Sequence, residues 1–266
     1  MLNNIFLKTL RDQRKSLLYW GIGLIAMAVI MALVYPTIKN MPSINQYLNE
    51  LPESVKEMFG PGIIDYGSPT GYFGTELFSF MVPLLLLVFG IGFGANAIAG
   101  DEEKGTLGFL LTNPVPRWRV VVDKFGVLII SMVLLGLLFW AGLAISMPGL
   151  GIDLSLLKLA EATFGAIALA LVFASLAFMV GCVKGNKGMS LGITSGLAVL
   201  TYFLNSLGGL VNWLKDYRFL SPFYHYMEPD TLANGISPMH ILVLLVLVAV
   251  FFAVSIPAFN RRDISV

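Results

Sequence analysis

Six long apolar runs dominate the sequence and determine its fold class. An α-helix rises about 1.5 Å per residue, so runs of this length cross a hydrocarbon core of about 30 Å. They are continuous and lack the alternation of transmembrane strands, which favours helices over a barrel. Apolar residues make up 57% of the chain and the mean hydropathy is +0.81. We therefore expect an all-α polytopic membrane protein. The predicted spans are Leu17–Tyr35, Phe78–Ala99, Gly126–Ser146, Ala160–Cys182, Met189–Leu207 and Ile241–Phe259.

The rest of the chain contains no repeat, low-complexity tract or linker, so residues 1–266 are predicted to form one domain. Residues 2–16 place Leu2, Phe6 and Leu10 at helical spacing, with Lys8 and Arg11 on the other side. This pattern predicts an N-terminal amphipathic interfacial helix. The alternative is a frayed, charged start of the first span. The first apolar run is too long for a signal-peptide core and has no cleavage site behind it, so no signal peptide is expected.

The distribution of Lys and Arg predicts the orientation. Twelve of these residues fall in the segments that share a side with the N-terminus, and five fall on the other side. Cytoplasmic loops carry the excess of Lys and Arg, so both termini are predicted to be cytoplasmic in the plasma (inner) membrane. A long acidic segment, residues 36–77, would then lie outside. Whether an extracytoplasmic partner docks on it is left open.

Ionisable side chains are nearly absent from the middle of the spans. Ion and proton relays need such groups, so a proton-coupled transporter is not favoured. Asn96 and Thr201 are candidates for a polar pore lining, because each would lack a hydrogen-bond partner if it faced lipid. Gly90 and Gly94 have the spacing of close helix contacts. That contact could lie within one subunit, at a subunit interface or in a pore wall.

Few residues suggest catalysis or metal binding. His225 and His240 are far apart in sequence and no His-Glu-x-x-His motif occurs, so they are interpreted as interface residues and no metal site is predicted. Lone Cys182 excludes an intrachain disulfide and is expected to pack as a small apolar residue. Gly100 and Gly105 have the spacing of a phosphate-binding loop, but the essential Lys is missing and three acids lie between them. No catalytic residue and no nucleotide site are therefore expected, and nothing points to nucleic acid.

The polar segment from Gly100 to Arg119, between the second and third spans, carries the clearest functional pattern. Asp101, Glu102 and Glu103 would place negative charge at a helix N-terminus, which the helix dipole favours. An apolar stripe follows, and prolines end the helix before a basic return to the membrane. The stripe consists of Leu107, Leu110 and Leu111. These features predict a short cytoplasmic helix across the inner face, or alternatively a surface loop with capping acids.

This segment resembles the signature of ABC-2 type exporter permeases. The similar residues are Ala99-Gly-Asp-Glu-Glu-Lys-Gly-Thr-Leu, Leu110-Leu-Thr-Asn-Pro-Val-Pro-Arg and Lys124. The amphipathic start, the six spans, Leu220-Ser-Pro-Phe and Phe259-Asn-Arg-Arg-Asp extend the resemblance over nearly the whole chain. Pro116, before Arg117, departs from the small residue that the family often has there.

The resemblance implies that the segment is a coupling helix seated in a groove of a separate ATPase subunit. The implied ATPase-coupling residues are Asp101, Glu102, Glu103, Gly105, Thr106, Leu107, Leu110, Leu111 and Arg117. It also implies a working unit of two permeases, identical or homologous, and two ATPase subunits. ATP and Mg would be bound by the ATPase partner and not by this chain.

The expected function is thus that of the permease of an ATP-driven ABC exporter. A path with neutral polar and apolar walls, at a dimer interface between the first, second and fifth spans, suits an amphipathic or hydrophobic cargo. A peptide antibiotic, a drug or a lipid-linked molecule fits this description. The alternatives are a scaffold or sensor subunit that supports assembly of an extracytoplasmic protein, and a sodium-efflux permease.

Overall fold

The computed structural model describes residues 5–41, 67–107, 115–208 and 211–262 as a bundle of helices without a strand among them. Within these described ranges, six helices are long and apolar enough to cross a membrane, which confirms the predicted all-α, six-span fold. They comprise residues Ile5–Lys39, Pro69–Glu103, Arg117–Leu150, Leu156–Lys184, Lys187–Leu207 and Pro238–Arg261. Several extend beyond the apolar runs, because polar residues at their ends continue the helical backbone.

Four of these spans are built on single α-helices: α1 (Ile5–Lys39), α9 (Leu156–Lys184), α10 (Lys187–Leu207) and α14 (Pro238–Arg261). The third span combines α8 (Arg117–Ser146) with the 3-10 turn η3 (Pro148–Leu150). Short elements connect α10 to α14. They are α11 (Asn212–Lys215), η4 (Arg218–Leu220), α12 (Pro222–Met227) and α13 (Thr231–Asn234).

The second span is composite. It runs through α4 (Pro69–Phe73), the π-helical η1 (Gly74–Met81), α5 (Val82–Ala95), the π-helical η2 (Asn96–Gly100) and α6 (Asp101–Glu103). Its start is well defined, because the Ser68 hydroxyl accepts a hydrogen bond from the Gly71 amide and Pro69 takes the first helical position. π-helical turns are rare and often occur at functional sites.

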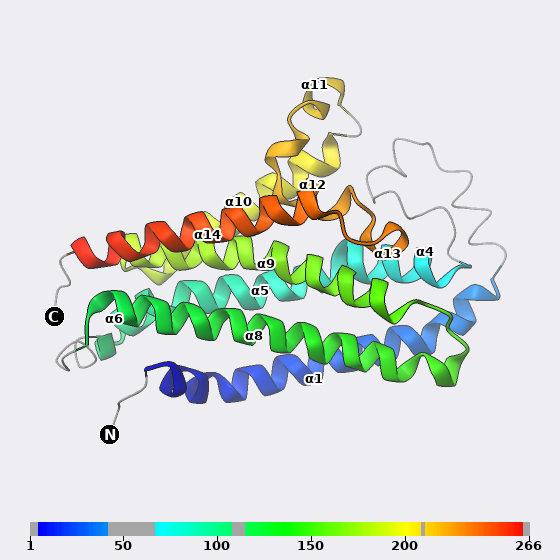
Figure 1. Ribbon diagram of the computed structural model, residues 1–266, viewed down its shortest axis with the longest axis horizontal. Helices are drawn as coiled ribbons and strands as arrows, with labels where there is room; N and C mark the ends of the chain where they lie inside the picture. Colours follow the sequence, from blue (N-terminus) through cyan, green and yellow to red (C-terminus); the bar gives the residue numbers. More distant parts are fainter. Residues whose placement is uncertain (1–4, 42–66, 108–114, 209–210, 263–266) are drawn as a thin grey trace.

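The long helices run side by side, and α1 begins at the same end of the bundle at which α14 ends (Figure 1). We call this the termini end, and the opposite end, where α4 and α13 lie, the loop end. The α9 helix occupies the centre, and 89% of the residues in its apolar 18-residue stretch are buried. It packs most extensively against α5 and α14, while α1 packs along α8.

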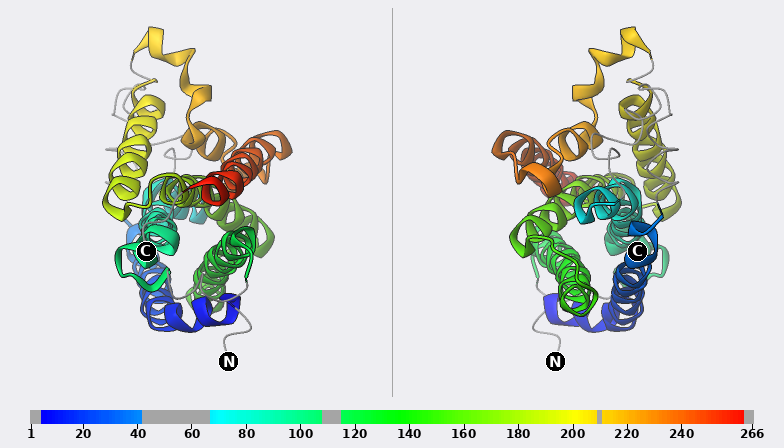
Figure 2. Two further views of the ribbon diagram at one scale, coloured as in Figure 1. Left: turned by 90° about the vertical axis from the view of Figure 1, so that its left-hand side faces the viewer. Right: turned by 90° about the vertical axis from the view of Figure 1, so that its right-hand side faces the viewer.

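Helices α10 and α14 are much more exposed. Only 22% and 17% of the residues in their apolar 18-residue stretches are buried. Figure 2 shows α10 leaning away from the bundle on one side of α9, with α14 on the other. Exposed apolar residues on these helices face whatever surrounds the subunit, either lipid or a second membrane protein.

The beginning of α1 takes a different course from the rest of the helix. Figure 2 shows these first turns crossing the termini end. The ring of Phe6 lies against Gly126 of α8, since a Cβ atom built on this glycine would be 3.5 Å from the ring. An amphipathic helix over residues 2–16 stays a prediction, and the described chain continues it into the first span without a break.

Candidate coupling site at the termini end

The second span ends in a tight turn built by two residues of the signature. Gly105 has a φ of 69°, the left-handed conformation that glycine adopts at little cost, and its amide donates to the Glu102 carbonyl at 2.9 Å. The Thr106 hydroxyl donates to the Asp101 carbonyl at 3.0 Å. Together they satisfy carbonyls that the end of a helix leaves open.

This turn corrects the prediction for the three acids. Asp101–Glu103 do not begin a new helix; they form the last turn of the second span. The prediction was wrong because the apolar run ends at Ala99, whereas the helix continues for four more residues. A helix C-terminus carries partial negative charge, so the dipole disfavours carboxylates there. Each acid is instead held by a group from another part of the chain.

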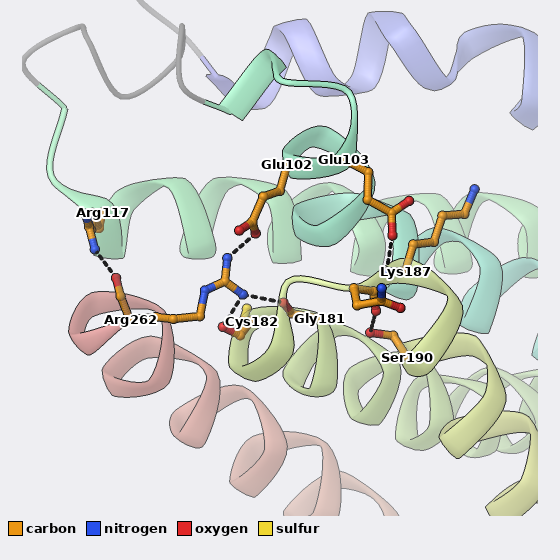
Figure 3. Close-up of polar contacts among 9 residues, drawn as sticks. Glu102, Glu103, Arg117, Gly181, Cys182, Lys187, Ser190 and Arg262 are labelled. Atoms are coloured by element: carbon orange, nitrogen blue, oxygen red, sulfur yellow. Dashed lines mark hydrogen bonds and ion pairs between the residues drawn. The ribbon is translucent and has the colours of Figure 1, made fainter. Parts of the chain in front are cut away.

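Glu102 forms an ion pair with Arg262, the residue that follows α14 (Figure 3). The same guanidinium donates to the carbonyls of Gly181 and Cys182 at the end of α9, at 3.2 and 3.1 Å. It therefore joins the second span, α9 and α14. Both charged side chains are mostly buried, at 15% and 19% exposure. Low local polarity strengthens such a pair but makes either partner costly alone.

Arg117, at the start of α8, binds the backbone of the same C-terminal segment that contains Arg262. Its guanidinium donates to the Arg262 carbonyl at 2.7 Å, with a longer contact of 3.5 Å to the Asn260 carbonyl. The third span is thereby attached to the end of α14. Arg117 contacts backbone within its own chain here, rather than lying free on the surface.

Glu103 is bound to the beginning of α10. Its Oε1 atom accepts a hydrogen bond from the Lys187 amide at 2.8 Å, and the Asn186 side chain caps the same helix by accepting from the Met189 amide at 2.7 Å. A carboxylate is favourable at this N-terminus. Figure 3 shows Glu103 reaching from the second span to this turn.

Asp101 forms an ion pair with Lys124 of α8, whose ammonium also donates to the Ala97 carbonyl. The Lys124 side chain is only 3% exposed and that of Asp101 is 30% exposed. The three successive acids thus contact α8, α14 and α10 in turn. We call Asp101, Glu102, Glu103 and their partners Lys124, Arg262 and the Lys187 amide the acidic hub.

The apolar part of the predicted coupling helix is only partly described. Leu107 is buried at 1% exposure against its own chain. Leu110 and Leu111 lie outside the described residues. Whether this stripe contacts an ATPase stays a prediction.

Gly90 and Gly94 both face α9. A Cβ atom on Gly94 would lie 2.3 Å from the Ala174 carbonyl oxygen, and one on Gly90 would lie 3.0 Å from the Ala174 Cβ atom. Both glycines thus make their close contact with α9 of the same chain. This is the first of the three alternatives, a contact within one subunit.

The two candidate pore residues differ. Asn96 lines a cavity between α1, α5 and the start of α10. Thr201 needs no polar partner outside its own helix, because its hydroxyl donates to the Leu197 carbonyl at 2.7 Å. The premise that Thr201 would lack a hydrogen-bond partner was therefore wrong.

Two cavities flank the α5 side that faces α10. One, of about 430 Å³, lies between α5 and α10 and is lined almost wholly by apolar side chains such as Leu87, Ile91 and Tyr202. The other, of about 400 Å³, lies toward the termini end and includes Gln13, Ser16 and Asn96 in its wall. We call them the apolar chamber and the polar chamber.

His225 and His240 are far apart in sequence, yet their Nδ1 atoms are 3.2 Å apart. His225 Nε2 lies 2.9 Å from the Phe219 carbonyl, which can only accept. Neutral His225 therefore carries its proton on Nε2, and its Nδ1 accepts from His240. Burial, more than the neighbouring His240, lowers the pKa of His225. Among the described residues no group of three or more potential metal ligands occurs.

Sequence reasoning missed two partners in the acidic hub, the Lys187 amide and Arg262. For Arg262 a signal was present, because the basic C-terminal residues and the three acids were predicted to lie on the same side of the membrane. Nothing in the sequence selected Arg262 over Arg261 as the partner of Glu102. Cys182 is buried, and its carbonyl, not its thiol, takes part in the site.

Comparison with known proteins agrees with this architecture. Residues 3–264 match the family model described as ABC-2 family transporter protein. The chain is also 32% identical over 173 residues to the probable ABC transporter permease protein NosY of Stutzerimonas stutzeri. That alignment covers 61% of this chain and 60% of the relative. With six apolar helices and a family match over nearly its whole length, this chain is a multi-pass membrane permease of the ABC-2 transporter family.

Proposed function

We propose that this permease is the membrane subunit of an ATP-driven exporter, with the termini end in the cytoplasm of a plasma (inner) membrane. Two copies, or one copy and a homologue, would work with two ABC ATPase subunits that bind ATP and Mg. The acidic hub is the observation that carries the proposal. It ties the segment expected to contact the ATPase to three spans at once.

The hub provides a direct route for movement. A displacement of the turn at Gly105 acts on α8 through Asp101, on α14 through Glu102 and on α10 through Glu103. Charged hydrogen bonds of this kind are short and directional, so they transmit displacement better than apolar contacts, which can slide. ATP-driven closure of the ATPase pair would thereby move α10 relative to α5 and open the chambers between them to the outside.

The chambers support transport of an amphipathic or hydrophobic cargo. Their volumes lie within the range of about 300–1,000 Å³ of ligand pockets. No carboxylate is among the described residues that line them, which disfavours sodium as cargo. A scaffold or sensor role would use the same hub, and no described contact favours it.

Charge exchange within the hub tests the proposal without knowledge of the cargo. In a Cys182→Ala background, Ser195→Cys places a thiol in the apolar chamber, and an impermeant thiol reagent added outside reports its accessibility. With the ATPase present, ATP should increase the labelling rate several-fold. Glu102→Arg and Arg262→Glu should each abolish that increase, and the double variant should restore it.

Lys184→Gln is the matched control, since this exposed side chain lies at the same end outside the hub. An ATP-dependent increase that survives both single variants, with the ATPase still bound, would contradict coupling through the hub. An increase driven by a proton or sodium gradient without ATP would contradict the energy source.

The orientation has its own test. Single cysteines at Ser237, at the loop end, should react with the impermeant reagent in intact cells, and cysteines at Lys184 should not. The opposite pattern would reverse the assignment of the cytoplasmic side.

A further inference from the structure

The apolar and polar chambers are adjacent, on the side of α5 that faces α10. Val88 and Gly92 of α5 line both of them. A Cβ atom on Gly92 would meet nothing within 4 Å, so the wall is open at the junction. One molecule could therefore occupy both chambers, with different chemistry at its two ends.

The walls of the two chambers differ in polarity. The apolar chamber is bounded by aliphatic and aromatic side chains of η1, α5 and α10, together with Phe223 of α12. The polar chamber offers an amide from Gln13, a hydroxyl from Ser16 and an amide from Asn96, with the Trp20 ring beside them. An acyl chain fits the first environment, and a hydrogen-bonding head group fits the second.

Lys187 supplies the only charge in either wall among the described residues. It is half-buried, and no described carboxylate lies within ion-pair distance of its ammonium, since Glu103 binds its backbone amide instead. A partly buried cation gains most from an anionic partner. As the first residue of α10, it lies at the termini end of that span, at the level expected for lipid head groups.

We infer that the two chambers together bind an anionic membrane lipid, with its charged head group at Lys187 in the polar chamber and one of its acyl chains in the apolar chamber. That this lipid is the exported cargo rests on the proposed export function. That the lipid binds in the chambers does not depend on export. The lipid would lie with its head toward the termini end, which is the orientation of lipids in the leaflet on that side.

The hub gives this site a connection to the ATPase. Glu103 holds the backbone of the same residue whose side chain would contact the head group. Movement of the second span would therefore displace Lys187 together with the start of α10, and would weaken the head-group contact as the chambers open.

Binding can be measured on the full permease with its ATPase, without ATP. The complex is exposed to phosphatidylcholine vesicles doped with tail-labelled phosphatidylglycerol, or with equally labelled phosphatidylcholine, and the lipid retained after purification is counted. We expect about tenfold preference for the anionic lipid, the size of one charged hydrogen bond of about 1.5 kcal/mol. Lys187→Gln should remove the preference and Lys187→Arg should restore it.

Gly92→Leu should lower retention of both lipids, because the new side chain would obstruct the junction. Two controls should behave as the parent protein: Lys184→Gln, an exposed cation three residues away, and Gly196→Leu, an exposed glycine of α10 with equally open surroundings. Each variant must copurify with the ATPase as a single species, which excludes misfolding as the cause.

Three results would overturn the inference: equal retention of the two lipids by the parent protein, a preference that survives Lys187→Gln, or full competition by soluble glycerol phosphate, which has no chain. These outcomes are separate from failure of the export proposal. If ATP still opens the chambers while lipid preference is absent, only the lipid site is wrong.

Discussion

The two sides of α5 illustrate two uses of small residues in one helix. Toward α9, Gly90 and Gly94 let the backbones approach until no room remains for a methyl group. Toward α10, Gly92 borders empty space. Small residues on the first side allow tight packing, and on the second side they leave a passage. The difference separates the part of the bundle that should stay fixed from the part that should move.

The largest expected effect comes from filling the packed side. Gly94→Ala would place a methyl group 2.3 Å from the Ala174 carbonyl oxygen, so α5 and α9 must separate. We expect a loss of about 3 kcal/mol of unfolding free energy, the upper part of the range for overpacking. Gly92→Ala should change it by less than about 0.5 kcal/mol. Denaturation in bicelles would measure both, and equal losses would remove the distinction between the two sides.

Breaking the buried ion pair of the hub should have the next largest effect. Asp101→Ala leaves the Lys124 ammonium buried with only the Ala97 carbonyl. Fully buried pairs cost about 3–5 kcal/mol when one partner is removed; because Asp101 is 30% exposed, we expect roughly 2 kcal/mol. Asp153→Ala, an exposed acid at the loop end, is the control. Comparable losses in the two variants would argue against a special role for the hub.

One buried polar group should reveal an imperfection of the packed bundle. The Ser131 hydroxyl of α8 is fully buried and forms no hydrogen bond with any described group. Ser131→Ala should therefore stabilise the fold by about 1 kcal/mol, because an unsatisfied polar atom is removed. Ser175→Ala is the matched control, since that hydroxyl donates to the Val172 carbonyl at 2.8 Å. If Ser131→Ala destabilises the permease, the hydroxyl has a partner in the membrane.

The smallest effect concerns pH at the loop end, where α12 packs against α14. Burial lowers the pKa of His225 below its ordinary value of 6.5, so the unfolded chain takes up a proton first as the pH falls. The contribution of neutral His225 to stability is thus fully present above pH 6.5. It is lost as the pH falls below 6.5 toward the lower pKa of His225 in the folded state. A proton on Nδ1 would also face the His240 proton. His225→Asn should flatten this decline in thermal melts; an unchanged decline would point to another group.

Sequence patterns predicted the spans well, because membrane insertion depends on local apolarity that can be read from the chain. They failed where helices continue past the apolar run, as at Asp101–Glu103. Hydropathy does not distinguish a helical polar turn from the start of a new helix. The partners of those acids lie at positions 124, 187 and 262, and only packing of the spans brings them together.

The cavities were also beyond the sequence. A path between the first, second and fifth spans was expected, but the residues proposed to line it were chosen for polarity alone. Asn96 lines a cavity, whereas Thr201 satisfies its hydroxyl within its own helix. Short-range bonding of Thr in a helix is common, so polarity is a poor guide to which face lines a pore.

The link between α9 and α10 has a mechanical consequence. Only Gly185 and Asn186 separate the two helices, and Gly185 adopts a φ of 65°. Under the proposed coupling, this link would be the pivot about which α10 moves relative to the central helix. Glu103 binds the first residue of α10, about one residue beyond this link. The rest of the helix extends roughly 30 Å from that point. Labels on α10 near Leu207 and on α9 near its start should therefore separate much more during ATP turnover than labels near Ser190 and Gly181. Under the proposed coupling, a small displacement at the termini end would become a large displacement at the loop end.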